Sequence, residues 1–307
     1  MRIGVLRGHE DSFPYAFVAR VNSTGQGVYA DFVQLGGTSL NQPVPFSVIV
    51  DRVSHLVPYC TAYLKMAALQ GVHCINHIIR RSAHDRFFAH AAAERLGVAQ
   101  PRTVLLPNRA YGAEVGNEDL RNLWPVDFGR YLDHVGVPCL LMPVSDWSGK
   151  EVVAIHSEDE LLDHYNRSGE RTLMLQERVE AEARVRVLTV GRREARAMRH
   201  DLETAAYAQD AGALPAELRD AAEEAALSIV TVLGYDMGAV DFAVKGGRLL
   251  GGCVDLVPEL DYQSLKDAHF PWVVEKMAAF AVQQALAERS PQTPVAAEEP
   301  NPRPARP

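Results

Sequence analysis

The stretch Gly234–Pro258, GYDMGAVDFAVKGGRLLGGCVDLVP, constrains the fold of this chain more than any other part of the sequence. Two apolar runs flank Gly246-Gly247, so the pattern predicts a β-hairpin with strands at Ala239–Lys245 and Arg248–Leu256. Each strand carries one acid, Asp241 or Asp255. A buried carboxylate needs a partner or a metal ion. Two of them on neighbouring strands indicate half of a site for a hard cation such as Mg²⁺, and the alternative is that they end in water.

The register of this hairpin decides whether the two acids meet. With a strict two-residue turn, Asp241 lies opposite Gly252, and Asp255 then points to the other face of the sheet. A loop of odd length, or one bulge, brings both acids to the same face. Gly251-Gly252 is a suitable place, because glycine adopts the backbone angles that a bulge requires. The metal hypothesis therefore predicts one of these two irregularities, with Gly251-Gly252 as the site of a bulge.

Composition excludes some classes of function. A net charge of −8 argues against general nucleic-acid binding, which needs a basic surface. No apolar run approaches the roughly 18 residues of a membrane span, and residues 1–11 lack the apolar segment of a signal peptide. The cysteines are scattered in apolar contexts, which is typical of reduced thiols in a cytoplasmic protein: Cys60, Cys74, Cys139 and Cys253.

The first 80 residues alternate strand and helix patterns, which predicts a small α/β domain. The expected strands are Met1–Arg7, Val28–Leu35, Phe46–Val50 and Val72–Ile75, and the expected helices are Phe13–Val21 and Val57–Leu69. Ligands of such domains tend to bind beyond the carboxyl ends of the strands. This places Asp51, Arg52, Ser54, His55 and Asn76 near a cleft.

The rest of the chain mixes further helices and strands. Expected helices are Ser82–Leu96, Val126–Val135, Glu158–Tyr165, Ala216–Leu233 and Pro271–Ala287. Expected strands are Thr103–Leu106, Cys139–Met142, Glu151–Ile155, Thr172–Glu177, Val185–Val190 and Glu194–His200. Arg184 and Arg186 alternate on one strand face, with Arg199 on the partner strand, which suits a phosphate or carboxylate or else a solvated edge. Residues 288–307 are Pro-rich and predicted to be disordered.

In the order and spacing of these parts, residues 1–285 resemble the ATP-grasp superfamily. The likeness is strongest to carboxylate–amine ligases related to glutathione synthetase and ribosomal-protein glutamate ligases. The stretches on which this likeness rests are residues 48–76, residues 82–107, the run VGVPCLLMPVSDWSGKEVVAIHSEDELLDHY, the run TLMLQERVE and the hairpin described above. The resemblance implies an α/β fold with an N-terminal α/β domain at 1–80 and two α+β lobes, 81–170 and 171–287, that enclose the nucleotide.

The resemblance also implies ATP and Mg²⁺, and a carboxylate that is activated as an acyl phosphate before an amine displaces the phosphate. By residue it implies an adenine hinge at Gln176, Glu177, Arg178 and Val179, with Glu180 or Glu182 near the ribose. It implies phosphate contacts from Arg86 and Lys150, Mg²⁺ ligands at Asp241 and Asp255, and Arg186 with Arg184 at the transferred phosphate. Arg52, Ser54 and His55 would face the substrate, an amino acid or small peptide.

The sequence departs from the family pattern at several of these positions. Arg86 stands where a lysine is usual, after Asp85, and Met142 replaces a second lysine. The loop after Pro143 has one glycine, and no asparagine follows Asp255, so a third metal ligand would have to come from Glu259 or Asp261. Two functions follow: an ADP-forming ligase, or a degenerate ATP-grasp protein that binds nucleotide or a ligand without turnover, as a regulatory or scaffold subunit. The sequence leaves open whether the protein forms a homo-oligomer.

Overall fold

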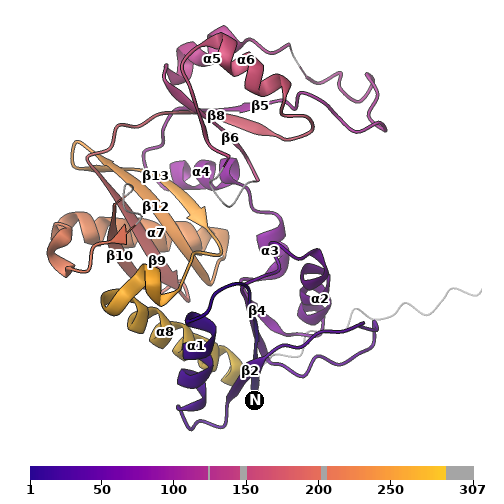
Figure 1. Ribbon diagram of the computed structural model, residues 1–307, viewed down its shortest axis with the longest axis vertical. Helices are drawn as coiled ribbons and strands as arrows, with labels where there is room; N and C mark the ends of the chain where they lie inside the picture. The colour runs from indigo at the N-terminus through magenta and orange to yellow at the C-terminus, as the bar shows by residue number, and fades with distance from the viewer. Residues whose placement is uncertain (124, 146–150, 202–205, 288–307) are drawn as a thin grey trace, which may run out of the picture.

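The computed structural model describes residues 1–123, 125–145, 151–201 and 206–287. Figure 1 shows three sheets arranged along the long axis of the molecule, each accompanied by helices. The predicted tail, residues 288–307, lies outside the described residues. Within them, no helix is long and apolar enough to cross a membrane.

The first sheet is parallel, with strand order β2-β1-β3-β4. Its strands are β1 (Arg2–Leu6), β2 (Tyr29–Phe32), β3 (Val48–Asp51) and β4 (His73–Ile75), and its helices are α1 (Phe13–Asn22), α2 (Pro58–Leu69) and the short α3 (Ile78–Ser82). All four side chains of β3 are buried, as expected for a parallel strand covered on both faces. The carboxyl ends of β1 and β3 lie side by side, so the segments that follow them meet.

The sheet farthest from the first is antiparallel, in the order β5-β8-β6-β7. It contains β5 (Thr103–Leu106), β6 (Cys139–Pro143), β7 (Val153–Ile155) and β8 (Leu173–Glu177), packed on α5 (Phe128–Val135) and α6 (Glu158–Asn166). Helix α6 begins at Glu158, as predicted, because the hydroxyl of the preceding Ser157 accepts a hydrogen bond from the backbone N–H of Glu160.

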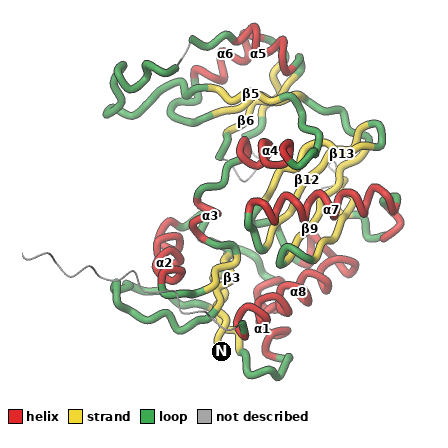
Figure 2. Tube along the Cα trace, turned by 180° about the vertical axis from the view of Figure 1, so that it is seen from behind, coloured by secondary structure: helices red, strands yellow, loops and turns green. Residues whose placement is uncertain are grey.

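The middle sheet is antiparallel, in the order β11-β10-β9-β12-β13. Its strands are β9 (Ala183–Val190), β10 (Glu194–Asp201), β11 (Ala206–Tyr207), β12 (Met237–Lys245) and β13 (Arg248–Asp255). One face packs against α7 (Ala216–Leu233) and α4 (Arg86–Arg95), and Figure 2 shows α7 lying across the strands. Although α4 precedes the outer sheet in sequence, it packs on the middle one. The 3₁₀ turn η1 (Ala211–Ala213) connects β11 to α7.

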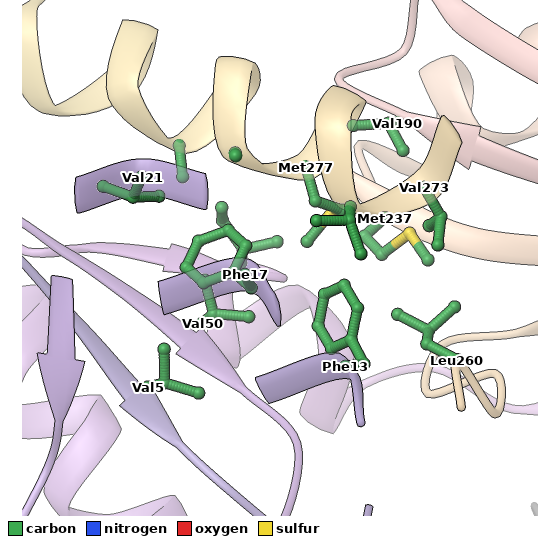
Figure 3. Close-up of a cluster of buried hydrophobic side chains, with 14 of the residues drawn as sticks. Val5, Phe13, Phe17, Val21, Val50, Val190, Met237, Leu260, Val273 and Met277 are labelled. Carbon is green, nitrogen blue, oxygen red and sulfur yellow. The ribbon is translucent and has the colours of Figure 1, made fainter. Parts of the chain in front are cut away.

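The largest core joins the first and middle sheets through α8 (Tyr262–Leu286). Phe13, Phe17 and Val21 of α1 face Val273 and Met277 of α8 (Figure 3). Apolar residues of the middle sheet complete it, including Val190 and Met237. Burial of about 25 cal/mol per Å² of apolar surface makes this shared core the main force that fixes the two sheets relative to each other.

The expected α/β class is confirmed, but two predicted helices have wrong boundaries. The helix predicted at Ser82–Leu96 is split: Ser82 ends α3, and α4 begins after Asp85, whose carboxylate accepts from the N–H of Phe88 at 2.6 Å. The stronger cap thus lies three residues later. The last helix begins at Tyr262 rather than Pro271, with Lys266 at φ 52° interrupting it. The strand β11 and helix α3 are too short for a periodic pattern to predict.

Candidate functional site

One face of the middle sheet changes from apolar to polar along β9. Leu188 and Val190 lie in the core under α8, while Arg184 and Arg186, on the same face, lie beyond it and are half-buried. Their partners in register are His200 for Arg184 and Asp241 for Arg186. Arg199 lies on the partner strand β10, as expected, but it pairs with Val185, so its side chain points to the opposite face from Arg184 and Arg186.

The predicted bulge is present in the hairpin. Asp241 pairs with Cys253 and Phe242 with Gly251, so Gly252 is the extra residue. Gly251 and Gly252 have φ values of 98° and 115°, which residues other than glycine rarely adopt. Because Asp255 pairs with Ala239, two residues from Asp241, both acids lie on the same face. The bulge therefore brings the two carboxylates together as the metal hypothesis requires.

Arg186 lies between these two acids. Its Nε and Nη2 donate to the carboxylate oxygens of Asp241, each at 2.7 Å, and its Nη1 is 3.7 Å from Asp255 Oδ2. Burial alone would lower the pKa of Arg186, but the charge and hydrogen bonds of Asp241 raise it overall. Burial raises the pKa of Asp255, with the nearby Arg186 opposing the shift. A fixed cation thus balances one of two closely spaced negative charges.

Further titratable groups border this cluster. His200 and Tyr207 stack with ring centroids 4.9 Å apart, and burial lowers the pKa of His200 and raises that of Tyr207. Burial also raises the pKa of Cys253 to about 11; Arg86 lowers it in part and the two acids raise it. Since such effects are short-ranged, Arg86 at the start of α4 lies near Cys253. The site is therefore rich in cations and suits an anionic ligand.

The predicted hinge residues lie where the chain passes from the outer to the middle sheet. Glu177 ends β8, and Arg178 and Val179 follow before β9 begins at Ala183. Arg102 Nε donates a hydrogen bond to the carboxylate of Glu177 at 3.0 Å, and this bond is the main reason why the pKa of Glu177 is lowered.

The side chains at either end of this segment contact protein groups. Gln176 contacts His90 and Thr103 at 3.2 Å each, and Glu182 accepts from the N–H of Gly246 at 2.8 Å. Residues 176–182 are thus tied at both ends to neighbouring elements.

Of the two predicted phosphate contacts, the structure describes Arg86 alone. The backbone N–H of Arg86 donates to Val144 O at 3.1 Å, which places the start of α4 beside the loop after β6. Met142 is buried, and packs with Val144 and Met174. Lys150 lies outside the described residues. An apolar contact therefore stands where a lysine is usual in the family, which agrees with the departure noted from sequence.

Arg52, expected to face the substrate, is buried in an ion pair. Its Nε and Nη2 donate to the carboxylate of Glu10 at 2.7 and 2.5 Å, and Nη2 also donates to Pro258 O. Glu10 in turn accepts from the N–H of Leu260. This pair joins the carboxyl ends of β1 and β3 to the segment after β13. Whether Arg52 also meets a substrate stays a prediction.

Ser54 and His55 line a cavity of about 360 Å³ between the first sheet, α3 and the end of β13. Ser54 donates to Asp51 Oδ2 and accepts from Arg81, which also pairs with Asp51. Arg81 is buried, and its Nη2 has no hydrogen-bond partner among the described residues. Burial, followed by the charge of Arg81, lowers the pKa of His55. The cavity therefore contains a neutral imidazole beside a buried cation.

The donor set at the hairpin fits a magnesium ion. Mg²⁺ is usually held by one or two carboxylates together with water and phosphate oxygens, and Asp241 and Asp255 supply the carboxylates. Neither substitute for the absent asparagine is free: Glu259 accepts from Ser264, and Asp261 accepts from Ser12. In the described part of the chain, no three His, Cys, Asp or Glu side chains group as a metal site.

Sequence patterns did not single out several of the residues that build this site. Glu10, Arg81, His90 and Gln100 belong to no motif, and their contacts link positions far apart in sequence. The only sequence signal for Glu10 is its place among the polar residues that follow the first buried strand. His90 and Gln100 gave no signal of their own.

No protein-family model and no curated protein sequence matches the chain. Solved structures do match nearly its whole length. D-alanine–D-alanine ligase from Bacillus anthracis complexed with ATP has a TM-score of 0.67 at 14% identity, covering 93% of this chain and 97% of that one. A RimK domain ATP-grasp protein from Sphaerobacter thermophilus has a TM-score of 0.65 at 20% identity, covering 92% and 100%.

A third match is the macrocyclase MdnC from Microcystis aeruginosa, bound with the precursor peptide MdnA. It has a TM-score of 0.60 at 16% identity and covers 92% of this chain and 99% of that one. These solved structures share the fold of this chain over nearly their whole lengths, at sequence identities of 14–20%. The chain has the ATP-grasp fold, as its sequence predicted.

Proposed function

We propose that this protein is an ATP-dependent carboxylate–amine ligase that forms an acyl phosphate and releases ADP. The observation that carries the proposal is the pair Asp241 and Asp255, brought to one sheet face by the bulge at Gly252 with Arg186 between them. Solved structures of the same fold include a ligase in complex with ATP. The parts 1–80, 81–170 and 171–287 are the proposed N-terminal domain and the two lobes.

In this proposal the nucleotide lies between the outer and middle sheets. Gln176, Glu177, Arg178 and Val179 hold the adenine, Glu182 lies near the ribose, and Arg86 and Lys150 contact the phosphates. Asp241 and Asp255 hold Mg²⁺, which when bound neutralises charge on the phosphate oxygens. Arg186 and Arg184 stabilise the negative charge of the group being transferred.

The proposed reaction has two steps. A substrate carboxylate oxygen attacks the γ-phosphorus, the bond to the β-phosphate oxygen breaks, and ADP leaves with that electron pair. The nitrogen of an amine then attacks the acyl carbon, inorganic phosphate leaves, and the amine loses a proton. Arg186 occupies both carboxylate oxygens of Asp241 in the structure, so it would have to turn toward the phosphate for Asp241 to hold the cation, and its charge would then be paired with the phosphate.

The cavity beside Ser54 and His55 is the proposed place for the substrate. It opens between the first sheet and the end of β13, next to Ser145 of the loop after β6, where the phosphate would arrive. The neutral imidazole of His55 and the Arg81 cation suit an amino acid or small peptide. One solved structure of this fold holds a precursor peptide, which keeps a longer peptide among the candidates.

Release of ADP tests this proposal. The protein, ATP and Mg²⁺ are combined with a panel of amino acids and dipeptides, and ADP and phosphate are measured. We expect stoichiometric ADP and phosphate with at least one substrate pair, abolished by Arg186→Met. Binding of ATP without ADP on any pair would contradict the ligase proposal.

The same result would favour a second function, nucleotide binding without turnover in a regulatory or scaffold role. The specific observation in its favour is Met142, an apolar side chain buried where a lysine is usual in the family. Under that function, ATP binds and protects the fold against unfolding, and Arg186→Met changes neither ADP nor phosphate release, because neither occurs.

A further inference from the structure

The bulge in the hairpin is held from outside by the segment that follows α4. Ala99 forms a parallel bridge with Leu250, and the N–H of Gly251 donates to Ala99 O at 2.9 Å. Ala93 of α4 packs against the same place, since a Cβ added at Gly252 would lie 3.2 Å from the Ala93 Cβ. The geometry that sets Asp255 relative to Asp241 therefore depends on groups beyond the hairpin itself.

Gln100 connects this bulge to a buried histidine. Its Nε2 donates to Gly251 O at 2.5 Å and to Val98 O at 3.0 Å, which uses both hydrogens of the amide. Its Oε1 lies 2.7 Å from His90 Nδ1 and has only lone pairs to offer. His90 Nδ1 must therefore carry a hydrogen and donate it.

His90 then continues the chain of hydrogen bonds to the hinge. It is buried, and burial lowers its pKa, with the bond to Gln100 opposing the shift. The ring is therefore neutral near pH 7, and with Nδ1 protonated its Nε2 can only accept. The donor is Gln176 Nε2 at 3.2 Å, whose other hydrogen goes to Thr103 Oγ1. Each hydrogen of the Gln100 and Gln176 amides, and each ring nitrogen of His90, thus has one assigned partner.

We propose that His90 is a positioning residue that couples the nucleotide hinge at Gln176 to the bulge beside Asp241. The inference rests on the proposed function, because it takes Gln176 as part of the hinge and Asp241 as a metal ligand. When Gln176 is held in place, His90 keeps one tautomer, Gln100 keeps its direction, and Gly251 keeps its donor. Loss of Gln176 lets the ring and the Gln100 amide reorient, and the spacing of Asp241 and Asp255 is no longer fixed.

Inorganic tripolyphosphate with Mg²⁺ is the probe, because it has phosphates for the hairpin but no adenosine for the hinge. Its dissociation constant is measured by isothermal titration for the native chain and for Gln176→Met, which keeps side-chain length but cannot donate. We expect binding to weaken about three- to tenfold although the probe does not touch the hinge. Thr103→Val is the matched control: it removes the other partner of Gln176, leaves the relay intact and should change binding less than about twofold.

A double-mutant cycle separates the relay from independent local damage. Gln100→Met removes the donor to Gly251 directly, so the variant Gln100→Met/Gln176→Met should bind no more weakly than Gln100→Met alone. If the affinity losses of the two single variants multiplied in the double variant, the two side chains would act independently, and the inference would be overturned. Each variant is first shown by its thermal unfolding transition to be folded at the titration temperature.

The outcomes for the native chain distinguish this inference from the proposed function. If neither Mg·ATP nor Mg·tripolyphosphate binds, the proposed function fails and the inference fails with it. If Mg·ATP binds but Mg·tripolyphosphate does not, the inference alone fails, since the hairpin then has no affinity of its own to adjust. It also fails alone if both bind and Gln176→Met binds like the native chain.

Discussion

Replacement of Gly252 by alanine tests whether the bulge aligns the two acids. A Cβ at this position would lie 3.0 Å from Ile229 Cδ1 and 3.2 Å from Ala93 Cβ, both in a packed core. Overpacking of this kind costs about 1–3 kcal/mol. The φ of 115° adds about 1–3 kcal/mol of backbone strain for a residue with a side chain. We therefore expect the free energy of unfolding to fall by roughly 2–6 kcal/mol.

Gly247→Ala is the matched control for this change. Gly247 also has a positive φ, 70°, but a Cβ there meets nothing within 4 Å. Only the strain of a left-handed residue applies, about 1–2 kcal/mol. Denaturant unfolding measures both variants, and titration with Mg·ATP shows whether the acids remain aligned. We expect Gly252→Ala to lose Mg·ATP affinity and Gly247→Ala to keep it. Equal stability losses and equal affinities would refute the reasoning.

Three further predictions concern the ion pairs and a buried histidine. Asp241→Asn should weaken Mg·ATP binding at least about tenfold. Its free energy of unfolding should fall by only about 1–3 kcal/mol, because Asp255 still balances the charge of Arg186. Equal losses of binding and stability, measured by titration and by denaturant unfolding, would make Asp241 structural. Arg52→Met should lower the free energy of unfolding by about 3–5 kcal/mol, because it leaves the buried carboxylate of Glu10 unpaired; a loss below about 1 kcal/mol in urea would contradict this. The pKa of His84 is lowered to about 4 by burial. The unfolded chain therefore binds this proton first, and stability that is complete above about pH 6.5 is lost as the pH falls toward 4, by about 2 kcal/mol at pH 5; His84→Gln should flatten that part of the unfolding profile.

The sequence was most informative where chemistry and backbone geometry constrain the same residues. The metal hypothesis required a loop of odd length or a bulge to bring the two acids to one face, and Gly251-Gly252 could be predicted as the bulge because glycine adopts the backbone angles that it needs. The helix Ala216–Leu233 was predicted with its observed boundaries, because Gly234 adopts the left-handed cap at φ 73° that ends it. Local signals of this kind do not depend on the rest of the chain.

Contacts between distant segments could not be predicted in the same way. The resemblance placed Arg52 at a substrate, but nothing in its neighbourhood in the sequence indicated the ion pair with Glu10, 42 residues away. The pairing of Arg186 with Asp241 depends on the register of β9 on β12, which only the folded sheet determines. His90 and Gln100 become informative only when their hydrogen bonds are seen together.

Titration of the native chain with ATP, in the presence and absence of Mg²⁺, tests most directly whether the hairpin is a nucleotide–metal site. We expect ATP to bind and its affinity to rise with Mg²⁺, because Asp241 and Asp255 lie on one face and share the ion with the phosphates. The dependence on Mg²⁺ should disappear in Asp241→Asn. Absence of ATP binding, or binding that Mg²⁺ does not strengthen, would contradict the assignment of this site.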